Sequence, residues 1–255
     1  DLVTGVQTCA LPIWAKEILT LLNQQRDGST FNVSADVYPY LASYTTIGIL
    51  FPEYALAPND YEIVRQNRRN DLLDYVRDKV NRRNGPEATL FGTKPYKGKS
   101  LKQVADEKGI PFEKVLVDHM GPTGASAAYF TMDRDLQYRF IQDPYVMISS
   151  DGSPTMHHPR GYGSFAKVIE EFVVRDSLIT LPEAIRKMTS LPAEMIGIGD
   201  RGRLRKGYKA DILIFNPNNI KANASFAEPH KLATGFDYVI INGKIDRGQI
   251  GRAHV

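Results

Sequence analysis

The sequence lacks most of the features that mark secreted, membrane-spanning or nucleic-acid-binding proteins. It has one cysteine, Cys9, in 255 residues, so an internal disulfide framework is excluded and we expect a reducing, cytoplasmic compartment. No apolar run approaches the roughly 20 residues that a membrane span requires, and no signal-peptide pattern opens the chain. The formal net charge of +3 is too small to indicate a nucleic-acid partner. We therefore expect a soluble protein without a nucleic-acid or membrane partner.

Motifs for phosphate and metal binding are also missing. Residues 121–128 (GPTGASAA) are small and suggest a flexible segment, but the Lys-Ser/Thr pair that completes a phosphate-binding loop is absent. His157 and His158 are adjacent, and neighbouring side chains point in different directions and seldom share one ion. His119 at a helix end and His230 after a proline are simplest to explain as structural residues.

The two ends of the chain are related at the nucleotide level. Residues 8–14 read TCALPIW and residues 249–255 read QIGRAHV. Back-translation gives opposite strands of one nucleotide string, which resembles a short-read sequencing adapter. We therefore expect residues 1–14 and 249–255 to be artefactual and to pack against nothing specific, so they are excluded from the fold prediction. The only cysteine and the only tryptophan lie in these ends.

Helical and strand-like patterns alternate over residues 15–200. Helices are predicted over 15–25, 60–81, 100–108, 112–119, 164–174 and 180–188, and strands over 31–36, 88–91 and 145–149. Ser100 with Gln103, and Thr180 with Glu183, have the spacing of a capping box at a helix start. This alternation predicts an α/β protein with βα units and a parallel sheet or barrel.

The character of the sequence changes at about residue 201. Apolar runs at 210–215 and 238–241 predict strands, and Asn242-Gly243 directly after the second run is a strong hairpin signal. The segment 201–248 is therefore predicted to form a small antiparallel β subdomain.

Three stretches carry a family resemblance: 36–40 (DVYPY), 149–163 (SSDGSPTMHHPRGYG) and 187–204 (KMTSLPAEMIGIGDRGRL). They resemble the N-acyl-D-amino-acid deacylases of the amidohydrolase superfamily, and the tail is similar to the closing β-sandwich segment of amidohydrolases generally. The resemblance implies the later strands of a TIM-type (β/α) barrel over residues 15–200. It also implies C-terminal strands of a flanking β-sandwich over residues 201–248.

The activity implied by this resemblance is zinc-dependent hydrolysis of a small N-acylated D-amino acid. Amidohydrolases hold zinc mainly through an early His-x-His strand and ligands on middle strands, and these motifs are absent here. Because zinc needs three or four ligands, the chain is expected to be inactive alone, with Asp151 supplying at most one. A complete barrel also needs about 250 residues by itself. The oligomeric state stays open.

Asp151 is the candidate catalytic residue. It follows the apolar run 145–149, and Gly152 permits a sharp turn after it. In βα barrels the chemistry lies at the C-terminal ends of the strands, where a carboxylate can act as general base and then as general acid. The alternative is that Asp151 only caps the following turn, a common role for aspartate before glycine.

Candidates for substrate binding lie in the same blocks. The Arg160 guanidinium suits the free carboxylate of an N-acyl amino acid, which it can bind through two parallel hydrogen bonds; alternatively, Arg160 pairs with a structural acid. His158 in the same loop is a further candidate. Tyr38 and Tyr40 flank a proline at a strand end, where either hydroxyl could reach a site or the ring could simply pack.

Two other functions remain open at this point. One is a cyclic amidohydrolase of the dihydroorotase or hydantoinase type, against which the blocks 36–40 and 157–163 argue. The other is a structural or interaction module without chemistry. Zinc content and amide hydrolysis would separate the three.

Overall fold

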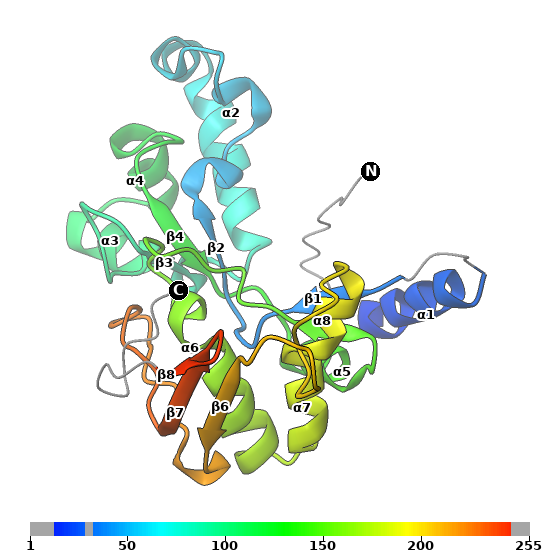
Figure 1. Ribbon diagram of the computed structural model, residues 1–255. Coiled ribbons are helices and arrows are strands. Elements are labelled where there is room, and N and C mark those ends of the chain that lie inside the picture. Colours follow the sequence, from blue (N-terminus) through cyan, green and yellow to red (C-terminus); the bar gives the residue numbers. More distant parts are fainter. Residues whose placement is uncertain (1–12, 29–32, 246–255) are drawn as a thin grey trace. The chain divides into compact units, whose positions relative to one another are not determined.

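The computed structural model describes residues 13–28 and 33–245 (Figure 1). Of the adapter-like ends, only residues 13 and 14 are described, as the start of helix α1 (Ile13–Gly28). The packing predicted for residues 1–12 and 249–255 lies outside the described residues. The described chain divides into two compact units. Unit 1 comprises residues 13–40, 132–154 and 159–245, and unit 2 comprises residues 41–131 and 155–158.

Unit 1 contains the parallel strand pair that the sequence predicts. Strands β1 (Ala35–Val37) and β5 (Val146–Ile148) pair in parallel, with Ala35 opposite Val146 and Val37 opposite Ile148. The ladder continues one step past β5, because the Ser149 amide donates to the Val37 carbonyl at 3.0 Å. Val146 and Ile148 are buried while Met147 between them is not, the alternation of a pleated strand.

Helices α5 (Arg134–Gln142) and α7 (Leu181–Met188) contact this strand pair. Unit 1 also contains α6 (Arg160–Lys167), which continues as a π-helix over Val168–Arg175, and α8 (Ser190–Met195), which packs on α7. The predicted helix over 164–174 thus starts four residues earlier and changes its hydrogen-bond pattern halfway. The buried core of this part joins Ile141, Ile148, Val168, Phe172 and Ala184, so α5, α6–π and α7 share one apolar centre with β5.

A buried lysine fixes the turn that leads into β5. The Lys187 side chain is fully buried, and its Nζ donates to the carbonyl oxygens of Asp143 and, at 2.7 Å, Val146. Burial lowers the pKa of Lys187 to about 8, and the nearby Glu183 carboxylate opposes that shift. Arg186 donates to the Pro144 carbonyl in the same turn. Helix α7 is therefore attached to the start of β5 through two cationic side chains.

The C-terminal part of unit 1 is an antiparallel sheet, as predicted. Strands β6 (Ile212–Phe215), β7 (Phe236–Ile241) and β8 (Lys244–Ile245) lie in that order, shown orange to red in Figure 1. Asn242 and Gly243 have φ of 52° and 75°, the two positive values that a type I′ hairpin requires. The hairpin prediction is confirmed.

Unit 2 has its own sheet and helices. Strands β2 (Ser43–Thr46), β4 (Ser126–Tyr129) and β3 (Thr89–Phe91) form an antiparallel sheet in the order β2-β4-β3. The helices are α2 (Tyr61–Asn81), α3 (Leu101–Lys108) and α4 (Phe112–His119). Short 3₁₀ helices in the two units cover Ile47–Leu50, Glu53–Ala55, Pro86–Ala88 and Pro217–Asn219. The expectation of a parallel arrangement is wrong for this unit.

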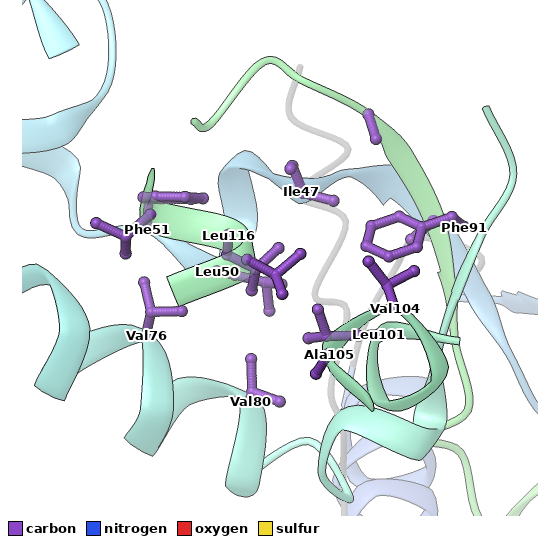
Figure 2. Packing of buried hydrophobic residues seen from close by; sticks show 14 of the residues in the cluster. Ile47, Leu50, Phe51, Val76, Val80, Phe91, Leu101, Val104, Ala105 and Leu116 are labelled. Atoms are coloured by element: carbon purple, nitrogen blue, oxygen red, sulfur yellow. The ribbon is translucent and has the colours of Figure 1, made fainter. Parts of the chain in front are cut away.

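The core of unit 2 is continuous and apolar (Figure 2). Side chains from α2, α3, α4 and the Ile47–Leu50 turn meet Phe91 of β3, and Leu50, Val76, Val104 and Leu116 are fully buried there. The segment 121–128, expected to be flexible, instead ends in strand β4 with Ala127 and Ala128 buried. Their small side chains let the central strand lie close to the rest of the core.

Helix starts follow the predicted capping chemistry with one difference. Ser100 and Gln103 exchange both hydrogen bonds of a capping box on α3. Thr180 accepts from the Glu183 amide at the start of α7, but the Glu183 carboxylate pairs with Arg186 at 2.8 Å. The second capping box is therefore only half formed. Among the helices described, none has the length and apolar character to cross a membrane.

Candidate active site

The candidate residues of unit 1 gather where the two parallel strands end. Tyr38 follows β1 directly, and Asp151 lies three residues after β5. Since β1 and β5 are parallel neighbours, their C-terminal ends lie at one edge of the pair, the edge that carries the chemistry in βα barrels. Gln137 of α5 donates to the Tyr38 carbonyl at 3.2 Å and so fixes the chain just after β1.

Asp151 has an unusual backbone and a defined side-chain partner. Its φ is 43°, in the left-handed region that costs an ordinary L-residue of order 1 kcal/mol or more. Its side chain is 52% exposed, and Oδ2 lies 2.9 Å from Nη2 of Arg160. Aspartate adopts this region more readily than most residues, in turns as well as at functional sites, so the backbone alone fits both the turn cap and the catalytic role.

Arg160 is buried at the start of α6. It is only 3% exposed, and its guanidinium carbon lies 4.7 Å from the centroid of the Tyr38 ring. At this distance the guanidinium and the ring make a cation–π contact. Asp151, Arg160 and Tyr38 thus form one cluster, named the site cluster below.

Tyr40 supports the cluster from behind. It is buried, its hydroxyl donates to the Pro159 carbonyl at 3.4 Å, and Phe226 packs edge-on against its ring with centroids 6.5 Å apart. Burial raises the pKa of Tyr40, and the Glu171 and Glu170 carboxylates add to the rise, so the phenol stays neutral. Its contact fixes the residue immediately before Arg160, which is a supporting role.

His158 lies in unit 2, where its surroundings are structural. The ring is fully buried, Nε2 lies 2.9 Å from the Ala42 carbonyl oxygen, and Tyr44 packs edge-on with centroids 6.2 Å apart. A ring without exposed surface has nothing to offer a substrate in this conformation. That His158 binds substrate stays a prediction, and these contacts indicate a packing role within unit 2.

The side chains do not fit a metal centre. Over residues 13–28 and 33–245, no three or more His, Cys, Asp or Glu side chains come together in a way that could hold a metal ion. Asp151 pairs with Arg160, and one carboxylate falls short of the three or four ligands that zinc requires.

Tyr162 lies next to the site cluster in sequence and contacts its loop, and sequence reasoning did not single it out. Its hydroxyl donates to the Pro154 carbonyl at 3.3 Å, and its ring lies against His230 with centroids 5.2 Å apart. The signal was present, because Tyr162 stands two residues after Arg160 in the block that carries the resemblance. Contact with His230, 68 positions later in the chain, has no local signature.

Surface pockets do not locate the site. A pocket of about 380 Å³ in unit 1 is lined by residues such as Arg201, Arg203 and Tyr208, and one of about 420 Å³ in unit 2 by residues such as Phe51 and Pro122. Neither lining includes a member of the site cluster. The candidate site is therefore defined by its side chains.

Similarity to known proteins covers nearly the whole chain. Residues 141–245 match the profile of the Amidohydrolase family. The N-acyl-D-glutamate deacylase of Alcaligenes xylosoxydans xylosoxydans is 33% identical over 242 residues, which are 92% of this chain and 43% of that protein.

Solved structures of deacylases show the same similarity. The N-acyl-D-glutamate deacylase of Bordetella bronchiseptica, complexed with zinc and a phosphonate inhibitor that mimics the tetrahedral intermediate, superposes with a TM-score of 0.72 at 27% identity. The match covers 94% of this chain and 45% of that one. A D-aminoacylase studied for its binuclear metal center gives a TM-score of 0.69 at 28% identity, over 91% and 43% of the two chains. The chain spans less than half the length of these relatives, and its mixed α/β fold is that of the matching part of amidohydrolases.

Proposed function

We propose, from the relationship of this chain to the N-acyl-D-amino-acid deacylases of the amidohydrolase family, that the whole protein hydrolyses the amide bond of an N-acyl-D-amino acid. The products are a carboxylate and the free amino acid. The observation that carries the proposal is the site cluster, in which a strained aspartate and a buried arginine meet at the carboxyl ends of two parallel strands.

Asp151 moves the proton in this reaction. Its carboxylate accepts a proton from the attacking water as the new C–O bond forms, and it returns that proton to the amide nitrogen as the C–N bond breaks. The accessible side chain suits a group that must meet both water and substrate. The strained backbone fixes the carboxylate relative to the strand that precedes it.

Arg160 binds the free carboxylate of the substrate. A guanidinium has five N–H donors in a planar fork, a geometry that matches a carboxylate, and Nη2 of Arg160 already holds the Asp151 carboxylate beside it. Tyr38 holds the plane of the guanidinium, and Tyr40 holds the backbone before it. This arrangement places the substrate carboxylate next to the group that moves the proton.

Zinc is the metal we assign to the whole protein, because a relative binds it. The ligands are to be sought outside the residues described here, since these lack a suitable group. Asp151 would contribute at most one ligand. We therefore propose that the 255-residue chain by itself neither retains zinc stoichiometrically nor deacylates.

The wider architecture follows from the same relationship. We assign residues 15–200 to the later part of a TIM-type barrel and 201–248 to part of a flanking β-sandwich. Leu213 and Ile214 are adjacent on β6 and 51% and 48% exposed. Because neighbouring strand residues point to opposite faces, both faces of this sheet present apolar side chains, as a sheet packed between two layers does.

The function is tested on a completed protein, made by joining residues 15–248 to the preceding part of a related N-acyl-D-glutamate deacylase. It is expected to hold zinc and to release the free amino acid from N-acetyl-D-glutamate, N-acetyl-D-aspartate or a neutral N-acetyl-D-amino acid, while the isolated chain does neither. Hydrolysis of a hydantoin or dihydroorotate instead would favour a cyclic amidohydrolase. A zinc-free completed protein that hydrolyses none of these would contradict the proposal.

A further inference from the structure

We propose that Tyr162, braced by His230 of the C-terminal part, is a positioning residue that holds the loop carrying Asp151. This inference rests on the proton-transfer role proposed for Asp151. This loop, residues 151–154, is called the Asp151 loop. Neither Tyr162 nor His230 is part of the site cluster, so their role is to set the geometry of the residue that reacts.

The Asp151 loop needs support from outside. All four of its residues are exposed, so burial contributes little to holding them. Its first residue has a positive φ of 43°, and such a conformation persists only when surrounding contacts impose it. The question is which contacts do so.

The first turn of α6 supplies them at both ends of the loop. Arg160 pairs with Asp151 at 2.9 Å, and the Tyr162 hydroxyl donates to the Pro154 carbonyl at 3.3 Å. Between them the two backbones touch, because a Cβ on Gly152 would lie 2.5 Å from the Gly161 Cα. The loop is therefore attached to α6 by an ion pair at its start, a close glycine contact and a hydrogen bond at its end.

These attachments respond differently to substrate. The Arg160 guanidinium is the group assigned to the substrate carboxylate, so its ion pair with Asp151 must be shared when substrate binds. The Tyr162 hydrogen bond reaches a backbone carbonyl and takes no part in that exchange. It is the contact that keeps the Asp151 loop in place while Arg160 turns to the substrate.

Tyr162 is itself held from the C-terminal part of the chain. The centroid of the His230 ring lies 5.2 Å from that of the Tyr162 ring, with 52° between the ring planes. The segment before His230 is a closed turn. In it the Glu228 amide donates to Ser225 Oγ at 3.1 Å, and the Ser225 amide donates to the Glu228 carbonyl at 3.2 Å. The same turn carries Phe226, which packs on Tyr40. One tail segment therefore braces two aromatic residues that stand beside the site cluster.

The kinetic test uses variants of the completed protein in which a single hydroxyl group or a single ring is removed. Tyr162→Phe deletes only the hydroxyl and is expected to lower kcat about tenfold while KM changes less than about threefold, because the substrate carboxylate still meets Arg160. His230→Ala should have the same kind of effect, and His230→Phe, which keeps a ring against Tyr162, should restore kcat. Tyr238→Phe on β7, an exposed tyrosine, is the matched control and should change nothing.

A second measurement does not depend on activity. Hydrogen exchange at millisecond times at the Gly152 and Ser153 amides should be at least about threefold faster in Tyr162→Phe than in wild type, and unchanged in Tyr238→Phe. If the proposed function fails, the completed protein is inactive but this difference remains. Unchanged exchange in the loop, or a Tyr162→Phe enzyme with full kcat, would overturn the inference and leave Tyr162 as a packing residue only.

Discussion

At the scale of single residues, the proposed function has one arginine serve two carboxylates. Arg160 is buried, lies over the Tyr38 ring and pairs with Asp151. A planar fork can meet a second carboxylate, whereas an ammonium is a single point of charge. We therefore expect the charge alone to be insufficient at this position.

Arg160→Lys tests this in the completed protein. The substitution keeps the positive charge but loses the bidentate geometry, so KM should rise about tenfold or more, the value of one charge-assisted hydrogen bond of about 1.5–3 kcal/mol. Steady-state kinetics measure it. Arg175→Lys is the control, because that arginine pairs with Glu171 and Asp176 on the far end of the π-helix and should leave KM unchanged. An Arg160→Lys enzyme with wild-type KM would remove Arg160 from substrate binding.

The closeness of two candidate residues was predictable from local sequence, whereas their roles stay predictions. Asp151 and Arg160 stand in one block of the resemblance, and the structure places them 2.9 Å apart. His158 stands in the same block, yet its ring is fully buried against Ala42. Sequence position gives the loop but not the direction of each side chain, so it cannot tell an anchor from a ligand contact.

At the scale of elements, helices α2 and α4 were predicted close to their observed bounds, whereas strand β4 and helix α5 were not predicted. α4 was predicted with its full bounds, and the Asn242-Gly243 hairpin was confirmed. Strand β4 was taken for a flexible segment because alanine and serine give little strand signal. Helix α5 (RDLQYRFIQ) was missed although Asp133 caps it by accepting from the Leu136 amide, because its charged residues obscure the apolar stripe.

The buried Lys187, which attaches α7 to β5, predicts that the stability of the protein depends on pH. The pKa of Lys187 is about 8 in the folded protein against an ordinary 10.5. Between these values the unfolded chain binds more protons than the folded one, so stability rises with pH. Relative to Lys187→Met, the wild-type protein should gain up to about 3 kcal/mol of stability as pH rises from 7 to 10.5.

Thermal midpoints of the completed protein and its Lys187→Met variant, measured in parallel across this pH range, check the effect. The difference between the two should move in favour of wild type by several degrees. Two curves that stay parallel would mean that Lys187 is not held with a lowered pKa.

At the scale of the whole molecule, the division into units was not visible in the sequence. Residues 155–158 join residues 41–131 in one unit although 23 residues of the other unit, 132–154, lie between them. Such an arrangement depends on contacts between distant segments, which periodicity and composition do not report. Parallel strands and the antiparallel sheet of the tail were predicted, because β5, β6 and β7 carry clear apolar runs; that β1 pairs with β5 was not specified.

The central claim of the proposed function is that Asp151 carries the proton in an amide hydrolysis. The measurement that tests this most directly is the kcat of Asp151→Asn in the completed protein on its best N-acetyl-D-amino acid. Asparagine has the same shape and tolerates a positive φ, so folding and KM should be preserved.

The expected result is a fall in kcat of about 10²–10⁴-fold, the contribution of general acid–base catalysis, while Asp237→Asn on the exposed face of β7 keeps full activity. An Asp151→Asn enzyme that turns over at the wild-type rate would contradict the account.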